Sequence, residues 1–215
     1  MRLIRLPGVF APRSDTWMLA REAVTSLKGD DEALELCTGS GAVALEMAAA
    51  GARVTAVDVS RRSIATVRLN ARVRGLRVRA LRGSLFEPVG DKTFDLIVTN
   101  PPYLPAPDAD LPQRGPERAW DAGLDGRALI DPICDAARAH LKPGGAILII
   151  HSSLSGTELT GERLAATGLD VDVPFRHRGP LGPLMLARVE HLEAIGALDD
   201  GQREEEVVIV RGRRA

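Results

Sequence analysis

Short apolar runs alternate with helical patterns along most of this 215-residue chain. The runs have the length of buried strands, and the segments between them show the apolar spacing of helices. Strands that alternate with helices are typical of a mainly parallel sheet with helices on both faces. The sequence therefore predicts an α/β fold with strands at residues 33–37, 54–57, 76–82, 94–98, 146–150, 169–175 and 206–210. It also predicts a long loop at residues 104–125, a helix at 126–140 and a turn at 142–145.

Composition narrows the class of protein. The chain has the length of one domain and shows no internal boundary, so residues 1–215 are expected to form a single domain. A formal net charge of −1 gives no overall attraction for nucleic acid, although local patches remain open. Cys37 and Cys134 are too few for a disulfide framework or a zinc site, so we expect two free thiols and no metal. The absence of a signal-peptide core and of a membrane-length apolar run predicts a cytoplasmic protein.

The strand at residues 94–98 stops at an Asn-Pro-Pro-Tyr sequence, residues 100–103. Two prolines prevent both further strand pairing and an immediate helix, so the chain must turn there. In open α/β sheets, ligands bind at the carboxyl ends of the strands. An amide oxygen and a carbonyl at such an end can accept hydrogen bonds from a substrate –NH2 group, while the ring stacks on a planar one. The alternative is a proline turn with a purely structural role.

The segment from Glu35 to Gly41 lies between a strand and a helix, where glycines let the backbone approach a ligand. Asp58 ends the next strand, where a carboxylate can bond ribose hydroxyls. The third glycine of a dinucleotide-binding loop is missing, and Glu35 would repel a pyrophosphate but suits a cationic amino-acid group. The pattern therefore favours S-adenosylmethionine over NAD. Glycines that serve only the packing of the turn are the alternative.

These elements together resemble class I S-adenosylmethionine-dependent methyltransferases. The Asn-Pro-Pro-Tyr sequence is similar to that of the HemK/PrmC glutamine methyltransferases and of adenine-amine methyltransferases. Residues 10–16 (Phe-Ala-Pro-Arg-Ser-Asp-Thr) and 119–127 (Ala-Trp-Asp-Ala-Gly-Leu-Asp-Gly-Arg) resemble segments of the short eukaryotic/archaeal-type release-factor members. The resemblance covers about residues 8–155. It implies a Rossmann-like, mainly parallel sheet of seven strands with an antiparallel last strand.

The resemblance also implies roles for individual residues. The cofactor S-adenosyl-L-methionine is expected to contact Thr16, Glu35, Cys37, Gly39, Gly41, Asp58, Ser84, Leu85 and Asn100. The substrate nitrogen and its planar group are expected to contact Asn100, Pro101, Pro102 and Tyr103. Of these, Asn100, Pro101 and Tyr103 are the expected catalytic residues. Two positions depart from the family pattern, because Cys37 replaces the first glycine of the loop and Ser84 stands where an aspartate is common.

Two segments remain open to several interpretations. Eight arginines and no acidic residue lie between Arg61 and Arg82. They indicate a surface for nucleic acid or an acidic partner, or, as we favour, a solvated face that protects an edge strand from aggregation. Eukaryotic family members dock a small zinc-binding activator by strand addition near this edge, which is a third option.

Residues 176–203 exceed the family's usual final connection, and their apolar spacing predicts a helix at 184–198. We expect it to pack on the sheet, with a lid or a docking helix as alternatives.

The leading hypothesis is a methyltransferase that acts on a planar –NH2 nitrogen, foremost a glutamine side-chain amide in a protein such as a translation release factor. One alternative keeps this chemistry with adenine in DNA or RNA, or a small molecule, as the acceptor. The other is a catalytically idle scaffold subunit that binds the cofactor.

In methyl transfer, an amide nitrogen loses its proton after it becomes cationic, so no strong base is needed. His151, at the end of a strand, is therefore expected to be structural.

Overall fold

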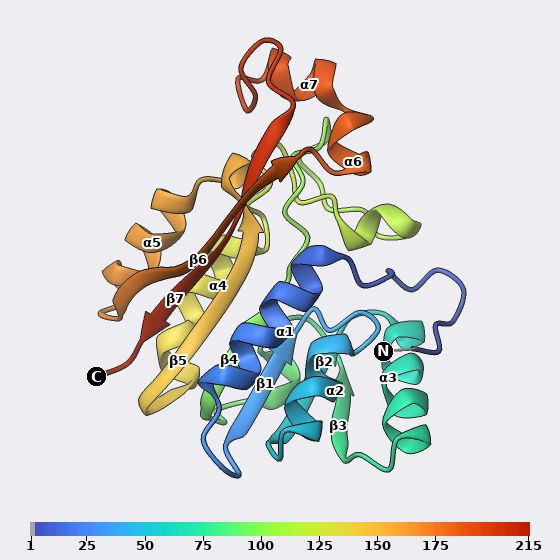
Figure 1. Ribbon diagram of the computed structural model, residues 1–215, viewed down its shortest axis with the longest axis vertical. Coiled ribbons are helices and arrows are strands. Elements are labelled where there is room, and N and C mark those ends of the chain that lie inside the picture. The colour runs from blue at the N-terminus through green and yellow to red at the C-terminus, as the bar shows by residue number, and fades with distance from the viewer. Residues whose placement is uncertain (1–2) are drawn as a thin grey trace.

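A computed structural model describes residues 3–215 and contains one seven-stranded sheet with the order β3-β2-β1-β4-β5-β7-β6 (Figure 1). The strands are β1 (Glu32–Leu36), β2 (Arg53–Asp58), β3 (Val78–Arg82), β4 (Phe94–Thr99), β5 (Leu141–Ser152), β6 (Asp170–Pro180) and β7 (Glu204–Arg213). The helices are α1 (Ser14–Ser26), α2 (Ala42–Ala49), α3 (Arg61–Val73), α4 (Ile130–Ala137), α5 (Thr157–Ala166), α6 (Pro183–Leu186) and α7 (Val189–Ala194). Strands β1 to β5 pair in parallel, and β7 runs antiparallel between β5 and β6. The predicted fold class is confirmed.

Alternating side chains along the central strands bury both faces of the sheet. On one face, Ala33 and Val98 belong to the cluster that packs against α1, α2 and α3. On the other face, Leu34 and Ile97 belong to the cluster that packs against α4 and α5. Figure 1 shows these two helix layers on either side of the sheet. The layers hold the central strands rigidly, so the loops at their ends start from fixed positions.

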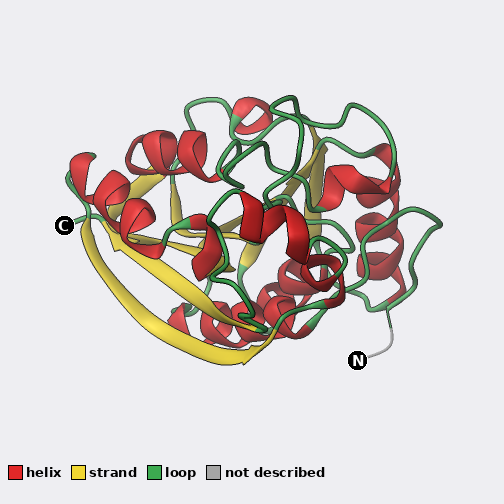
Figure 2. Cartoon of the chain, turned by 90° about the horizontal axis from the view of Figure 1, so that it is seen from above, coloured by secondary structure: helices red, strands yellow, loops and turns green. Residues whose placement is uncertain are grey.

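The order of the strands reverses between β1 and β4, which are paired through Leu34 and Ile97. Loops that leave two such strands diverge and leave a crevice at the carboxyl end of the sheet. Strands β6 and β7 extend beyond the others at this end and carry α6 and α7 (Figure 1). Figure 2, which looks onto the molecule from above, shows loops gathered over the strand ends. No helix among residues 3–215 combines the length and the apolar character needed to cross a membrane.

Four element predictions were wrong in extent. The helix expected at residues 126–140 is shorter, because Gly126 adopts a φ of +74° and α4 begins only at Ile130. The turn expected at 142–145 lies inside β5, where Gly144 donates to the Arg214 carbonyl at 2.8 Å. Strand β6 continues to Pro180 through its pairing with β7, so the extended connection begins later than residue 176. The helix expected at 184–198 is two short helices, interrupted where Arg188 turns toward the loop at residues 104–125.

Candidate active site

A cavity of about 590 Å³ opens at the carboxyl ends of β1, β2 and β4. Its volume is in the usual range for sites that bind a cofactor or a small ligand. The predicted site residues that line it are Thr16, Glu35, Cys37, Gly39, Asp58, Ser84, Leu85, Asn100, Pro101, Pro102 and Tyr103. We call the part formed by residues 35–40, Asp58, Ser84 and Leu85 the cofactor half. The part formed by Asp15, residues 100–103, Asp121 and Glu205 is the acceptor half.

Asp58 anchors the cofactor half at the end of β2. One carboxylate oxygen accepts from the Gly39 N–H at 2.9 Å, and the other accepts from the Ser60 N–H at 2.8 Å. Each carboxylate oxygen has two lone pairs, so both oxygens can accept a further bond from the cavity. Burial raises the pKa of Asp58, while the two backbone donors and Arg118 oppose that shift. The carboxylate is thus held in place and suits a pair of ribose hydroxyls.

Backbone strain is concentrated in this half. Among the described residues, Cys37 (φ +55°) and Leu85 (φ +45°) are the non-glycine residues with positive φ, and both line the cavity. Such a backbone costs roughly 1–3 kcal/mol for a residue with a side chain, and it is found mostly at functional sites. Cys37 therefore adopts the conformation that the family's glycine takes without cost. Burial raises the pKa of its thiol to about 12, so the thiol is neutral.

The glycines of the loop have different roles. Gly39 adopts a φ of +53°, and a side chain there would meet no atom within 4 Å, so its backbone faces open space in the cavity. Gly41 does not line the cavity. It has a φ of +79° at the start of α2, and a Cβ there would lie 2.8 Å from Val67. The structure thus gives Gly41 a packing role in place of the expected cofactor contact.

Glu35 is tied to the loop itself. Its carboxylate accepts a hydrogen bond from the Thr38 hydroxyl and another from the Ala44 N–H, at 2.9 Å, in the first turn of α2. Only 3% of the side chain is exposed, and burial raises its pKa to about 8. A carboxyl group at the beginning of a helix stabilises unpaired backbone N–H groups. The geometry therefore shows a loop-fixing role, and the expected cofactor contact remains a prediction.

Thr16 and Ser84 lie at the edges of the cofactor half. The Thr16 hydroxyl accepts from the Arg13 N–H at 3.2 Å at the start of α1, and it borders the cavity. Ser84 is exposed, and its hydroxyl makes no hydrogen bond within the described part of the chain. A hydroxyl at this position leaves room for an adenine ring but supplies a weaker acceptor than a carboxylate.

The acceptor half is built around the buried carboxylate of Asp15, to which the sequence analysis gave no role in the site. One oxygen of Asp15 accepts from the Asn100 amide nitrogen at 3.0 Å and from the Tyr103 hydroxyl at 3.2 Å. A carboxylate only accepts, so the –NH2 end of the Asn100 amide must face it. The Asn100 oxygen is thereby left free for a donor in the cavity. Asp15 is 8% exposed, which keeps water from competing for these bonds.

The backbone of Tyr103 is fixed from behind the cavity. Its carbonyl accepts from the Ser155 hydroxyl at 2.7 Å, and a Cβ on Gly126 would lie 2.3 Å from the same oxygen. The buried Arg127 guanidinium donates to the carbonyls of Ser155 and Gly156 and pairs with Asp131 at 2.7 Å. This explains the Gly-Arg pair at the end of the second family segment. The glycine permits the close approach, and the arginine fixes the loop that holds Tyr103.

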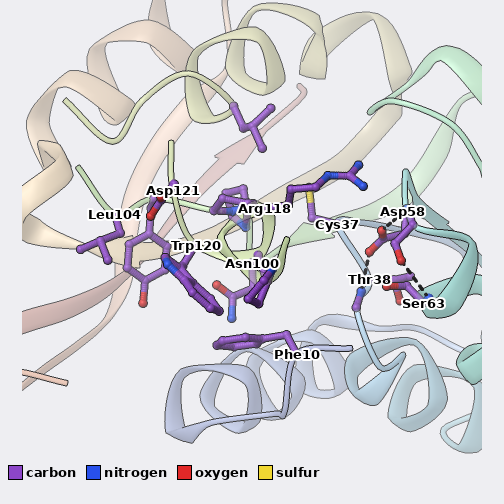
Figure 3. A pocket seen from close by; sticks show the side chains of 18 of the residues that line it. Phe10, Cys37, Thr38, Asp58, Ser63, Asn100, Leu104, Arg118, Trp120 and Asp121 are labelled. Atoms are coloured by element: carbon purple, nitrogen blue, oxygen red, sulfur yellow. Dashed lines mark hydrogen bonds between the residues drawn. The ribbon is translucent and has the colours of Figure 1, made fainter. Parts of the chain in front are cut away.

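The loop at residues 104–125 forms a wall of the cavity. Leu104 donates to the Trp120 carbonyl at 2.8 Å, and Ala122 donates back to Leu104 at 3.0 Å, so both ends of the loop are joined. Trp120 and Phe10 have ring centroids 6.2 Å apart and lie near Asn100 (Figure 3). Figure 3 also shows Arg118 extending from the loop toward Asp58. The loop therefore spans both halves of the cavity.

The C-terminal segment closes the acceptor half on another side. Leu181, Met185 and Leu192 are buried in a cluster with Leu104, and Tyr103 and Trp120 pack against it. Arg188 pairs with the Asp121 carboxylate at 2.7 Å and joins this segment to the loop. Glu205, at the start of β7, lines the cavity, is 9% exposed and accepts from the Gly182 N–H at 3.2 Å. Its other oxygen has no hydrogen-bond partner among the described residues.

Sequence reasoning missed several cavity residues, namely Phe10, Asp15, Arg118, Asp121 and Glu205. Asp15 was recoverable, because it lies in the first family segment beside Thr16. Glu205 carries no local signal, since it is one of three consecutive glutamates at the start of a strand.

His151 is not part of the site. Its ring is fully buried, Nδ1 lies 2.8 Å from the Ser152 carbonyl, and burial lowers its pKa to about 4. The expectation of a structural histidine is confirmed. Within residues 3–215, no group of three or more His, Cys, Asp or Glu side chains is placed to hold a metal ion.

Comparison with known proteins identifies the family. The model of the methyltransferase small domain family matches residues 1–111. The chain belongs to this family. A putative protein N5-glutamine methyltransferase of Methanocaldococcus jannaschii is 32% identical over 181 residues, which cover 84% of this chain and 90% of that protein. A release factor glutamine methyltransferase of Geobacter sulfurreducens is 39% identical over 150 residues, which cover 66% of this chain and 53% of that protein.

The chain thus spans about half the length of that bacterial relative. Among solved structures, the Mtq2–Trm112 complex of E. cuniculi, responsible for methylation of the eRF1 translation termination factor, contains a chain with the same fold. The TM-score is 0.67 at 19% identity, and the match covers 97% of this chain and 99% of that one. The methyltransferase family and the S-adenosylmethionine cofactor that the motifs predicted are confirmed.

Proposed function

We propose that this chain methylates the side-chain amide nitrogen of a glutamine in a protein, with a translation release factor as the acceptor. The observation that carries the proposal is the Asn100 amide, whose –NH2 group donates to Asp15, so that its oxygen is left to accept from a substrate donor in the cavity. The Asp58 carboxylate faces the other end of the same cavity. An –NH2 acceptor and a nucleoside-containing methyl donor would then meet between the two halves.

The residues of the cofactor half fit S-adenosylmethionine. The cavity has room for it, Gly39 leaves its backbone open, and Asp58 keeps lone pairs for ribose hydroxyls. Leu85 and Ser84 border the space where an adenine ring would lie, and Glu35, Thr16 and Asn100 border the amino-acid end. The bound cofactor supplies a methyl group on a positively charged sulfur.

At the acceptor, the work of the protein is positioning. An amide nitrogen is a poor nucleophile, because its lone pair is delocalised over the carbonyl. The Asn100 oxygen and the Pro101 carbonyl accept its two N–H bonds, which favours a pyramidal nitrogen and aims its lone pair at the methyl group. Tyr103 and the buried Pro102 hold the planar amide from the side. Oriented hydrogen-bond acceptors in a site that excludes water can lower a barrier by several kcal/mol.

The names of the relatives support a protein acceptor, because both curated relatives are glutamine methyltransferases. A translation factor as acceptor also supports a cytoplasmic location.

The activator partner remains a further proposal. The outer edge of β3 has no neighbouring strand in the sheet and is where a small zinc-binding protein would add one.

The proposal is tested by incubating the chain with a release factor, total RNA and DNA in the presence of methyl-labelled S-adenosylmethionine. We expect label in the release factor, and mass spectrometry should place one methyl group on a glutamine side-chain nitrogen. The Asn100→Ala chain is the control, since it should transfer no label while it still binds the cofactor.

Label on adenine would replace the proposed acceptor with nucleic acid. No transfer to any of the three, even with a zinc-binding activator from the same organism, would favour a small-molecule acceptor or an idle scaffold. The experiment therefore separates a protein acceptor from a nucleic-acid acceptor, and both of these from the remaining two hypotheses.

A further inference from the structure

Charge is strongly segregated on this nearly neutral protein. The eight arginines between Arg61 and Arg82 leave 20 basic and 29 acidic residues elsewhere, a net charge of −9 for the rest of the chain. All eight belong to α3, β3 or the short segments that follow them. Such a concentration of one sign creates a local field that the net charge of −1 conceals.

Four of these eight arginines line a groove of about 1100 Å³ at the amino ends of the strands. The groove has exposed cations on both sides: Arg68 and Arg72 from α3, Arg77 and Arg79 around the start of β3, and Lys92 from the loop before β4. Two carboxylates, Glu32 and Asp91, also line it, so the cations outnumber the acidic residues. Its apolar residues, such as Leu76 and Phe94, are buried or half-buried. Protein interfaces usually have an apolar centre, whereas phosphate-binding surfaces expose arginine and lysine.

Most of these cations have no partner in the protein. In the part of the chain that the structure describes, the side chains of Arg72, Arg77, Arg79 and Lys92 take part in no ion pair or hydrogen bond, although the Lys92 carbonyl lies 3.0 Å from His140 Nδ1. By contrast, Arg53 and Lys142 at the ends of the groove are paired with carboxylates at 3.1 Å and 2.7 Å. An unpaired guanidinium keeps its fork of donors available for a phosphate.

The groove and the catalytic cavity lie at opposite ends of the sheet. The groove borders the first residues of β2, β3 and β4, while the cavity borders the last residues of β1, β2 and β4. A polyanion in the groove would therefore leave the mouth of the cavity open. It would not deliver a base to Asn100, so the groove is separate from the acceptor site.

We propose that this groove, the basic groove, binds the phosphate backbone of an RNA. The step from a polyanion to RNA rests on the proposed function, because a translation release factor acts on the ribosome, which consists largely of RNA. The groove contains no exposed aromatic ring on which bases could stack, so binding should depend on the backbone and not on sequence. RNA bound there would hold the enzyme beside its acceptor and leave the catalytic cavity free.

The test measures binding without acceptor or cofactor, so it is independent of methyl transfer. Fluorescence anisotropy follows the binding of a labelled RNA duplex to the protein. An unlabelled DNA duplex of the same sequence and poly-glutamate are added separately as competitors. The variant carries Arg72→Glu, Arg77→Glu and Arg79→Glu. The control carries Arg21→Glu, Lys28→Glu and Arg213→Glu, three exposed cations outside the groove with the same change in charge. Thermal unfolding and cofactor binding, measured in separate samples, check that both variants remain folded.

We expect the RNA affinity of the groove variant to fall at least about tenfold, and the slope of log affinity against log salt to lessen by about 3. The control variant should keep the slope of the natural protein. Equal losses in both variants, or no RNA binding at about 100 mM salt, would overturn the proposal. If poly-glutamate or DNA competes as well as RNA, the groove serves an acidic protein or DNA and the assignment to RNA is wrong.

Discussion

The two halves of the cavity are held together over very different distances in the sequence. In the cofactor half, Asp58 contacts Gly39 across 19 residues, and Glu35 contacts Ala44 across 9. In the acceptor half, Asp15 contacts Asn100 across 85 residues and Tyr103 across 88. The first half is one strand–turn–helix unit with its neighbouring strand. The second is assembled from α1, β4, a long loop and the C-terminal segment.

This difference separates two physical tasks. Cofactor binding uses a strained turn whose shape follows from local sequence, as the positive φ of Cys37 and Gly39 shows. In the proposed function, acceptor binding requires the Asn100 amide in one orientation, and the neighbouring Asp15 carboxylate fixes that orientation. A carboxylate can reach Asn100 only from another element, because the prolines at 101 and 102 carry the following chain away. The two halves should therefore fail in different ways when they are mutated.

The largest effect is expected at the centre of the acceptor half. Asn100→Ala removes the oxygen that accepts the substrate N–H, and we expect turnover to fall by about 10³-fold or more. Cofactor affinity, measured by calorimetric titration, should change little, because Asp58 and the turn at residues 37–41 are untouched. Lost cofactor binding with retained turnover would show that Asn100 belongs to the cofactor half.

Asp58→Ala addresses the cofactor half. Two charge-assisted bonds to ribose hydroxyls would be lost, so we expect cofactor affinity to weaken by about 10²-fold. Turnover at saturating cofactor should stay close to the original. Isothermal titration and initial rates separate the two quantities. A fall in turnover with unchanged affinity would contradict the division into halves.

Asp15→Ala tests whether the acceptor half depends on a distant residue. The Asn100 amide would then be free to rotate, and we expect turnover to fall by about tenfold to a hundredfold with unchanged cofactor affinity. Asp15→Asn should restore part of the rate, because its side-chain oxygen can still accept from Asn100. Glu22→Ala, on the same helix but outside the cavity, is the control. Equal rates for Asp15→Ala and the control would refute the positioning role.

Glu35→Gln should affect stability more than catalysis. The pKa of Glu35 is about 8 in the folded protein against 4.5 for an ordinary glutamate. Between these values the folded state keeps a proton that the unfolded state releases, so Glu35 makes stability fall as pH rises from about 4.5 to about 8. The variant should remove up to about 1 kcal/mol per pH unit from this slope. Urea unfolding at a series of pH values measures it, with Glu46→Gln on α2 as control.

If the slope is the same for Glu35→Gln and the original chain while cofactor affinity falls, Glu35 is ionised and contacts the cofactor. That outcome would give it the role that the motif first suggested.

Local sequence predicted the strands, the sheet class and eleven of the residues that line the cavity, and the family match confirmed the methyltransferase assignment. The errors concern elements whose limits are set by other elements. Gly145 stays in β5 because it packs closely against the carbonyls of β4, and the last helical segment is broken where Arg188 reaches Asp121. Gly41 looked like a ligand contact but serves the packing of α2 on Val67.

By itself, the sequence determined that β4 ends in an amide, a carbonyl and a ring, and that a glycine turn with a following aspartate lies beside it. These are properties of short segments, since prolines and glycines limit the backbone locally. Only the tertiary structure decided which way the Asn100 amide faces and which carboxylates surround it. It also brought Arg68, Arg72, Arg77 and Arg79 to one groove at the far end of the sheet. Such arrangements depend on contacts between segments far apart in the chain, which local patterns do not encode.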